Sequence, residues 1–319
     1  MKALQAHSGT AGDAITREAF DRLLGEIRPK LHRYAARMTG SVIDGEDVLQ
    51  EAILKAIEAF PEAAPIANPE GWLFRIAHNA ALDHLRRRAR RETAVLDEET
   101  DMADPADPVA DRQIAAASLR TFMRLPPAQR SSVILMDVLG YSLQEIGGVL
   151  DTSIASVKAA LHRGRARLRE LADEPDDRPQ AVMTQSQRSL LGFYIDRFNA
   201  RDFNALRDML ADEVRLDLVA RTGLQGRKAV GTYFHNYAHT NDWRFALGLV
   251  DGRPAALACD PDDRSARPLY FVLLGWVDGR LLTIRDFRYA RYAVEGAEID
   301  LLDWRQPYYD IVPAIERIS

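Results

Sequence analysis

The most constraining feature of this sequence is a pair of helical segments joined by a tight turn between Ser142 and Arg169. Ser142, with Glu145 three residues later, forms the capping-box pattern that begins a helix. Asp151–Ser153 provides a three-residue turn. The second segment then places apolar residues at core spacing: Ile154, Val157, Leu161 and Leu168. The pattern predicts a helix-turn-helix, whose second helix enters the major groove of DNA.

The second helix of this motif carries the candidate DNA-contacting residues. They are short polar or basic side chains on its exposed faces: Ser156, Lys158, His162, Arg163 and Arg165. A lone basic helix is more often a solvated surface, but the capped helix and the turn before it favour DNA binding. We expect His162 to meet phosphate or solvent, because no second ligand stands at a suitable spacing for a metal. No metal site is predicted.

The charge of the chain is segregated, which changes what its net charge of -5 implies. Residues 84–91 contain five arginines and no acid, whereas residues 92–111 contain eight acids. Phosphates are neutralised by local contacts, so the net negative charge does not exclude a nucleic-acid partner. The acidic stretch also contains Pro105 and Pro108, and we predict a flexible linker over residues 92–110.

The composition limits which other classes of protein this chain can belong to. Hydrophobic residues make up 47% of the chain and charged residues 28%, which is typical of globular domains. The single cysteine, Cys259, excludes an internal disulfide. No apolar run approaches the roughly 18 residues that a membrane span needs, and the first residues lack the order of a signal peptide. We therefore expect a cytoplasmic, soluble protein with no membrane partner.

The periodicity predicts a multidomain chain of two all-α domains followed by an α+β domain. The all-α domains cover residues 16–91 and 111–172, and a second linker covers 173–184. The α+β domain covers 185–292 and a C-terminal tail covers 293–319. We predict one helix from Gln187 to about Leu210, a strand at Val214–Val219, and a short helix near Lys228–Ala238. Asp-Gly pairs at 251–252 and 278–279 predict hairpins in a curved antiparallel sheet.

Three motifs in order resemble the extracytoplasmic-function sigma factors of the sigma-70 family. The first is Asp47–Glu51 (DVLQE), the second runs from Gly71 through Asn79 to Arg87, and the third combines residues 125–130, 140–146 and 156–158. The resemblance covers residues 16–172. It implies that 16–91 is sigma region 2, which binds the polymerase clamp and melts the -10 element. It also implies that 111–172 is sigma region 4, which reads the -35 element, with core RNA polymerase (clamp and flap) and promoter DNA as partners.

The resemblance also implies roles for particular residues. It places Asp47, Gln50 and Glu51 against the polymerase. The -10 residues it implies are Trp72, Asn79, Asp83, Arg86 and Arg87. Asn79 would hold a flipped base and the arginines would hold phosphates. Trp72 either stacks on a base or fills the core, and core packing is the favoured interpretation. Many relatives carry Ser or Thr where this chain has Ala159, so the promoter sequence cannot be transferred.

The last third of the chain resembles the cone-shaped SnoaL-like (NTF2-like) fold, mainly by the order of its elements. Such a cone implies an apolar pocket that could bind a small molecule. Candidate pocket residues are Asp217, Tyr233, His235, Trp243, Tyr270 and Arg285. Asp217 lies on an alternating strand, and simple solvent exposure is the simpler interpretation. The sequence does not identify a carboxylate with an oxyanion partner, so we predict no catalytic residue, no cofactor and no enzyme activity.

Three hypotheses from different classes follow. The first is a sigma factor whose C-terminal domain regulates it, by folding back on the sigma regions or by binding a ligand. The second is a ligand-responsive DNA-binding regulator that does not engage polymerase. The third is a small-molecule enzyme tethered to DNA, which would require a buried carboxylate in the cone. The Asp47–Glu51 helix and the Trp72–Arg91 segment favour the first, because a simple regulator has no need of a melting module.

Overall fold

The chain divides into two compact units, Met1–Glu174 and Pro175–Ser319. A computed structural model describes residues 15–63, 65–92, 117–172, 174, 182–239, 243–263 and 267–302. The predicted linker at 92–110 lies outside the described residues except for residue 92, and the chain after residue 302 also lies outside them. Of the predicted linker at 173–184, residues 174 and 182–184 are described, and Thr184 already caps α9.

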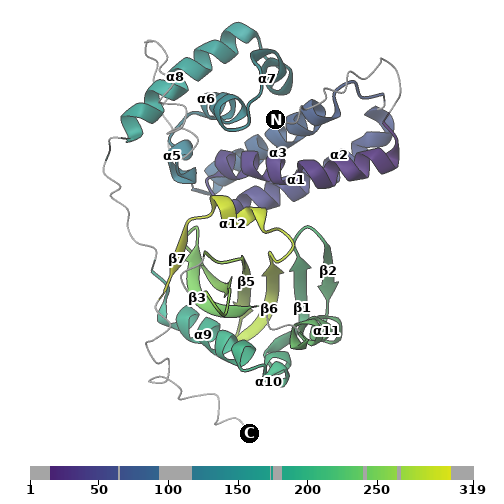
Figure 1. The fold of residues 1–319 in the computed structure, drawn as a ribbon, viewed down its shortest axis with the longest axis vertical. Coiled ribbons are helices and arrows are strands. Elements are labelled where there is room, and N and C mark those ends of the chain that lie inside the picture. The colour runs from purple at the N-terminus through teal and green to yellow at the C-terminus, as the bar shows by residue number, and fades with distance from the viewer. Residues whose placement is uncertain are drawn as a thin grey trace. The chain divides into compact units, whose positions relative to one another are not determined.

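The first helical group contains three long helices, α1(Arg17–Thr39), α2(Val42–Ala63) and α3(Pro69–Glu92) (Figure 1). Thr16 caps the start of α1 through its side chain, and Gly40 ends it with a φ of +79°, a conformation that glycine adopts without strain. The buried faces pack into one aromatic-rich core, in which Phe20 stacks on Phe60 at 4.2 Å between ring centroids. This arrangement confirms the predicted all-α organisation of this part.

The second helical group contains shorter helices, α5(Leu119–Met123), α6(Pro127–Val133), α7(Leu143–Leu150) and α8(Ile154–Ala172). One turn of π-helix, η1(Ile134–Val138), extends α6, and the amide of Leu139 donates to the carbonyl of Ile134 at 3.0 Å. The apolar faces of this group share a continuous core with the first group. The two groups, which the sequence predicted as separate domains, therefore form one compact helical unit.

The buried guanidinium of Arg130 on α6 joins the two groups. It is 4% exposed and donates to the carbonyls of Met38 (2.6 Å), Leu125 (2.7 Å) and Met123 (3.0 Å). Met38 belongs to α1, so this bond crosses from the second group to the first, while the other two stay within the second group. Gly40 makes room for the side chain of Met123, because a Cβ there would stand 2.4 Å from the Met123 Cγ.

The C-terminal unit is built on one curved sheet with the strand order β2-β1-β6-β5-β4-β3-β7 (Figure 1). Its helices are α9(Gln185–Asn199), α10(Phe203–Asp208), α11(Arg227–Ala238) and α12(Tyr292–Gly296). Its strands are β1(Leu210–Leu218), β2(Thr222–Gln225), β3(Arg244–Val250), β4(Arg253–Cys259), β5(Tyr270–Val277), β6(Arg280–Asp286) and β7(Ile299–Leu301). Residues of α9, α10 and α11 share one core with the inner face of the sheet. The predicted α+β architecture is confirmed.

Both predicted Asp-Gly hairpins are present. Asp251 and Asp278 have φ of 49°, and the glycines after them have φ of 77° and 74°, which is the geometry of a tight two-residue hairpin. Antiparallel pairing of β3 with β4 and of β5 with β6 follows directly from these turns.

Three expectations for this unit were wrong in detail. The helix predicted to run to about Leu210 is interrupted at Arg201, whose φ of 59° breaks it into α9 and α10. The sheet is mixed rather than purely antiparallel, because β1 pairs in parallel with β6. The sheet also extends past residue 292 into the predicted tail, since β7 pairs with β3 and Leu302 donates to Leu247.

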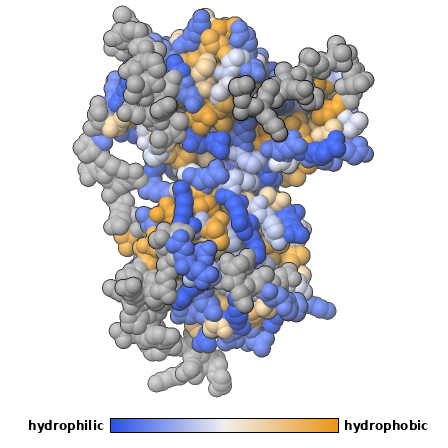
Figure 2. Space-filling view, viewed as in Figure 1, coloured by the Kyte–Doolittle hydropathy of each residue, from blue (hydrophilic) through white to orange (hydrophobic). Residues whose placement is uncertain are grey.

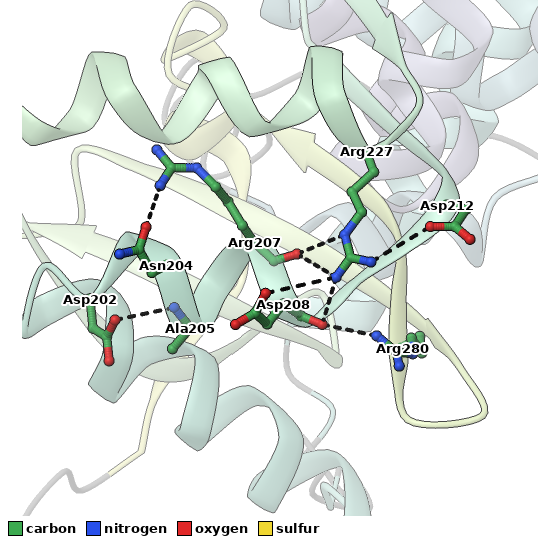
Figure 3. A network of polar contacts seen from close by, with 8 residues as sticks. All are labelled: Asp202, Asn204, Ala205, Arg207, Asp208, Asp212, Arg227 and Arg280. Atoms are coloured by element: carbon green, nitrogen blue, oxygen red, sulfur yellow. Dashed lines mark hydrogen bonds and ion pairs between the residues drawn. The ribbon is translucent and has the colours of Figure 1, made fainter.

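A polar network fixes the corner where α10, β1 and α11 meet (Figure 3). Arg227, the first residue of α11, donates to the carbonyls of Arg207 and Asp208 at 3.1 to 3.2 Å. Arg280 of β6 donates to the same Asp208 carbonyl at 2.9 Å. Two guanidinium groups thus satisfy the last carbonyls of α10, where the helix dipole favours a cation.

The surface of the C-terminal unit mixes apolar and hydrophilic residues on the face shown in Figure 2. Exposed large apolar side chains of this unit include Phe193, Val277 and Leu301. Among the described residues, no helix is long and apolar enough to span a bilayer.

Candidate nucleic-acid interface

The residues predicted to bind polymerase lie on α2. Asp47 and Gln50 are exposed, whereas Glu51 is half-buried. Glu51 accepts hydrogen bonds from Arg87 and Lys55, each at 2.7 Å, and these bonds hold the pKa of its carboxyl below the usual value. Asp47 and Gln50 are therefore presented to solvent, while Glu51 connects α2 to α3.

The residues predicted to read the -10 element lie on α3 in different environments. Asn79 and Arg86 are exposed, and Asp83 pairs with Arg86 at 3.1 Å. Arg87 is bound to Glu51, so this cation is shared between the two predicted surfaces. Trp72 is half-buried and packs near Phe20, with ring centroids 6.1 Å apart. This position agrees with core packing, and Trp72 also lines a cleft at the surface of the helical unit.

The helix-turn-helix has the local geometry that its sequence predicts. Ser142 and Glu145 form a complete capping box at the start of α7. Asp151 ends α7 with a φ of 52°, and the Ser153 hydroxyl accepts from the amide of Ser156 at 3.1 Å to begin α8. These contacts fix the residues at which α7 ends and α8 begins.

Two of the five residues predicted on α8 are clearly open to a partner, and a third is partly engaged. Lys158 and Arg163 are exposed. Ser156 is also exposed, but its hydroxyl lies 2.9 Å from that of Ser153.

The other two predicted residues of α8 are set into the protein. Arg165 forms a two-bond ion pair with Asp137, whose side chain is 2% exposed, so this arginine connects α8 to η1. His162 is half-buried and lines a cleft with Met136, Leu143 and Lys158. The structure thus brings Lys158 and Arg163 to the surface and holds Arg165 in a structural bond.

The two helical groups meet where α7 packs against α3. Arg75 of α3 donates to the carbonyl of Gly148 on α7 at 2.6 Å. A cleft of about 440 Å³ lies beside this bond, lined by Trp72, Arg75, Gln144 and Glu145 among others. The start of the predicted melting segment therefore faces the first helix of the helix-turn-helix.

A second contact between the groups is centred on Glu70. The Lys30 ammonium lies 2.5 Å from the Glu70 carboxylate and 4.2 Å from the centre of the Tyr141 ring. The Tyr141 hydroxyl donates to the same carboxylate. Partial burial alone would raise the pKa of Glu70, but the bonds from Lys30 and Tyr141 outweigh it and keep that pKa below its usual value. The three residues form one charge-assisted contact.

The candidate pocket residues of the C-terminal unit do not form one site. Tyr233, Trp243 and Tyr270 are buried in the core. Asp217 and Arg285 pair with each other at 3.4 Å on β1 and β6. Since their neighbours Leu216 and Ile284 belong to the core, Asp217 and Arg285 lie on the opposite face of the sheet. His235 is exposed and contacts His239 at 3.2 Å.

The core of the same unit contains a carboxylate that the sequence analysis did not single out. Asp286 is fully buried and accepts from the hydroxyls of Tyr237 (2.7 Å) and Tyr233 (2.8 Å) and from the amide of Arg288 (2.8 Å). Burial raises the pKa of Asp286 despite these bonds. Asp286 is the last residue of β6, and only its hydrogen bonds with the tyrosines of α11 reveal the cluster.

Within the described residues, no group of three or more His, Cys, Asp or Glu side chains is arranged to hold a metal ion. The residues that sequence reasoning missed are Lys30, Glu70, Arg75, Tyr141 and Asp286. Each acts through a partner distant in the chain, so neither spacing nor composition marks it.

Comparisons with known proteins match the helical unit to two family models and the chain to whole relatives. A Sigma-70 region 2 model matches residues 23–91, and a Sigma-70, region 4 model matches residues 119–168. The chain is 31% identical over 286 residues to the ECF RNA polymerase sigma factor SigG of Mycobacterium tuberculosis, covering 80% of this chain and 77% of that protein.

Solved structures are similar to this chain at lower identity. The Mycobacterium tuberculosis extracytoplasmic function sigma factor SigJ is 20% identical, with 83% of this chain and 95% of that chain covered at a TM-score of 0.32. A protein described as a polyketide cyclase, from Sinorhizobium meliloti, is 16% identical over 33% of this chain and 99% of that chain, at a TM-score of 0.26.

Proposed function

The chain belongs to the extracytoplasmic-function sigma factors of RNA polymerase, and on that premise we propose how its residues divide the work. Asp47 and Gln50 on α2 bind core polymerase. Asn79 and Arg86 on α3 take up the melted -10 strand. Lys158 and Arg163 on α8 bind the -35 element. The observation that carries this assignment is the exposure of these six side chains on three helices, while neighbours such as Arg165 are held inside the protein.

Promoter binding requires the helical unit to open. The -10 and -35 elements lie about 25 base pairs apart, which is roughly 85 Å at 3.4 Å per base pair. In the structure α7 contacts α3 through the Arg75–Gly148 bond, and α8 begins four residues after α7 ends. This contact keeps α8 near α3, so the two helices cannot reach both elements at once. We therefore expect the Lys30–Glu70–Tyr141 contact and the Arg75 bond to break when both elements are bound.

The C-terminal unit is proposed to regulate this sigma factor. It has its own hydrophobic core and its own buried polar cluster, neither of which contributes to the helical unit. A regulator must favour one state of the helical unit over another, and a ligand can act only through different affinity for the two states. As part of this proposal, the C-terminal unit acts by contacting the sigma regions of its own chain or by binding a ligand.

One experiment tests the regulatory role directly. In vitro transcription with core polymerase would compare the full chain with residues 1–178. We expect the shortened chain to differ from the full chain in promoter activity at equal core affinity. Equal activity of the two chains across the titration would overturn the regulatory proposal and leave the sigma activity untouched.

Residue assignments are tested by paired substitutions in the full chain. Lys158→Ala with Arg163→Ala should weaken promoter binding and reduce its salt dependence by about two phosphate contacts. Binding to core polymerase should be unchanged. Asp47→Ala with Gln50→Ala should weaken binding to core polymerase and leave the promoter-binding residues of α8 unaffected. Arg124→Ala, which removes an exposed cation of the same unit, is the matched control. Equal promoter affinity of the α8 double variant and the control would exclude Lys158 and Arg163.

A further inference from the structure

Two histidines on the exposed face of α11 form a close pair that takes no part in the DNA and polymerase surfaces. His235 and His239 are four residues apart, so their side chains lie one turn apart on the same side of the helix. Both side chains are exposed. Their ring centroids are 4.7 Å apart, but their Nε2 atoms are only 3.2 Å apart. The nitrogens are therefore the atoms that this arrangement brings together.

The separation of these two nitrogens matches a shared metal ion. Imidazole nitrogens bind zinc at about 2.05 Å, so two of them on one ion are about 3.4 Å apart at the tetrahedral angle. At the right angle of tetragonal sites the corresponding separation is about 2.9 Å. The observed 3.2 Å lies between these values. One ion can thus bind both nitrogens after small rotations of the rings, with no change in the backbone of α11.

The helix that carries the pair is held in place from its other side. Tyr233 and Tyr237 of α11 donate to the buried carboxylate of Asp286. Both tyrosines are buried, whereas both histidines are exposed, so the polar cluster and the histidine pair lie on opposite sides of one helix. A backbone held in this way keeps the two imidazoles at chelating distance before an ion arrives, which reduces the entropy lost on binding.

The neighbouring groups decide which class of ion fits. Among the described residues, no third histidine, cysteine, aspartate or glutamate joins the pair. The Arg201 guanidinium donates to the carbonyl of Tyr237 at the end of the same helix, so the surroundings are not acidic. Calcium and magnesium need several oxygen ligands, which the pair does not supply. Zinc, copper and nickel bind neutral imidazole and are the ions that suit this site.

We propose that His235 and His239 chelate one zinc ion, or a similar divalent transition-metal ion, through their Nε2 atoms, with water completing the coordination. The bound ion joins the last turn of α11 to the turn before it and so holds that end of the helix in place. The site differs from the cone pocket predicted from the sequence, because the partner of His235 is His239 on the same helix. It does not depend on the regulatory role of the C-terminal unit.

Zinc binding to the full chain, without a histidine tag, tests the site. Equilibrium dialysis at pH 8, where imidazole is neutral, should give one ion per chain, and magnesium should not compete. His235→Gln and His239→Gln should each weaken binding by at least about 100-fold, because a single imidazole loses the effective concentration that the second supplies. Both variants should fold, since both positions are exposed. His162→Gln, which removes a half-buried imidazole of the other unit, is the matched control and should bind zinc like the wild-type chain.

Hydrogen exchange of the same protein locates the ion. Amides in the last turn of α11 should exchange about tenfold more slowly when free zinc is about tenfold above its Kd. Cys259→Ser should leave both results unchanged, because this half-buried thiol is not part of the site. The proposal is overturned if no ion binds below about 1 mM zinc. It is also overturned if either single histidine variant binds like the wild-type chain, or if the protection appears only outside α11.

Discussion

The two units of this sigma factor each bury a charged group without an ion pair among the described residues, and they satisfy it in opposite ways. In the helical unit, the Arg130 guanidinium donates to three main-chain carbonyls. In the C-terminal unit, the Asp286 carboxylate accepts from two tyrosine hydroxyls and one amide. Burial lowers the pKa of Arg130 to about 10 and raises the pKa of Asp286.

The difference shows what each centre holds together. One carbonyl partner of Arg130, that of Met38, lies near the end of α1 in the first helical group, whereas Met123 and Leu125 belong to the second. The Met38 bond therefore exists only while the two helical groups are packed. The partners of Asp286 lie on α11 and in the turn just after β6, all within the C-terminal unit. We infer that the contact between the two helical groups, here called the joint, can break while each group stays packed. The C-terminal unit is instead stabilised by a polar cluster inside its own core.

The largest expected effect comes from removing the cation of the joint. Arg130→Ala leaves three buried carbonyls without donors and should lower the free energy of unfolding of the helical unit by about 4 kcal/mol. Hydrogen exchange of the full chain in urea, resolved by peptide, would show the loss in the helical unit alone. Arg124→Ala, whose exposed pair with Glu174 is worth about 1 kcal/mol or less, is the control. Similar losses for both variants would contradict the comparison.

Lowering the pH should change the stabilities of the two units in opposite directions. Burial lowers the pKa of His32 and of His78 to about 4, so in the helical unit the unfolded chain binds their protons first as pH falls below 6.5. Stability there is complete above pH 6.5 and falls toward pH 4, by up to about 3 kcal/mol for each histidine. The raised pKa of Asp286 acts in the opposite direction, because its stabilising effect is greatest at low pH and falls as pH rises through the folded pKa.

Urea titrations at pH 7 and pH 5, followed by the same exchange method, would measure these two slopes. His78→Gln should flatten the slope of the helical unit, and Asp286→Asn should flatten that of the C-terminal unit. Parallel slopes in the two units of the wild-type chain would refute this interpretation of the buried groups.

A smaller effect is expected from the donors of Asp286. Tyr237→Phe removes a buried hydrogen bond of 2.7 Å to the carboxylate and should cost about 2 kcal/mol. Tyr289→Phe, at a 46% exposed tyrosine of the same unit, should cost less than about 0.5 kcal/mol. Thermal unfolding of both variants would decide whether Asp286 depends on its tyrosines, and equal melting temperatures would exclude that dependence.

The smallest expected effect contrasts one substitution in the two units. Gly25→Ala lies within α1 with no atom within 4 Å of the new Cβ, and it should stabilise the helical unit by about 0.5–1 kcal/mol. Gly279→Ala has equal space but a φ of +74°, and it should destabilise the C-terminal unit by about 1 kcal/mol. Changes of the same sign in calorimetry would show that backbone conformation is not the cause.

Short-range patterns in the sequence predicted much of this structure. The capping box at Ser142 and Glu145, the turn at Asp151 and the two Asp-Gly hairpins all depend on residues a few positions apart, and each is present as predicted. The break at Arg201 was missed because a non-glycine residue with positive φ gives no compositional signal. The parallel pairing of β1 with β6 was missed because it joins strands distant in the chain.

The sequence by itself determined the family, the helix-turn-helix and which helices are basic, because motif and periodicity are local properties. Only the tertiary structure decided which of those basic residues are open. Lys158 and Arg163 remain exposed, whereas Arg165 is held by Asp137 and Arg87 by Glu51. It also decided that α7 covers the start of α3 and that Asp286 is buried among tyrosines. The partners of Arg165 and Arg87 lie 28 and 36 residues away in the chain, so their pairing depends on packing, which is fixed by the whole chain at once.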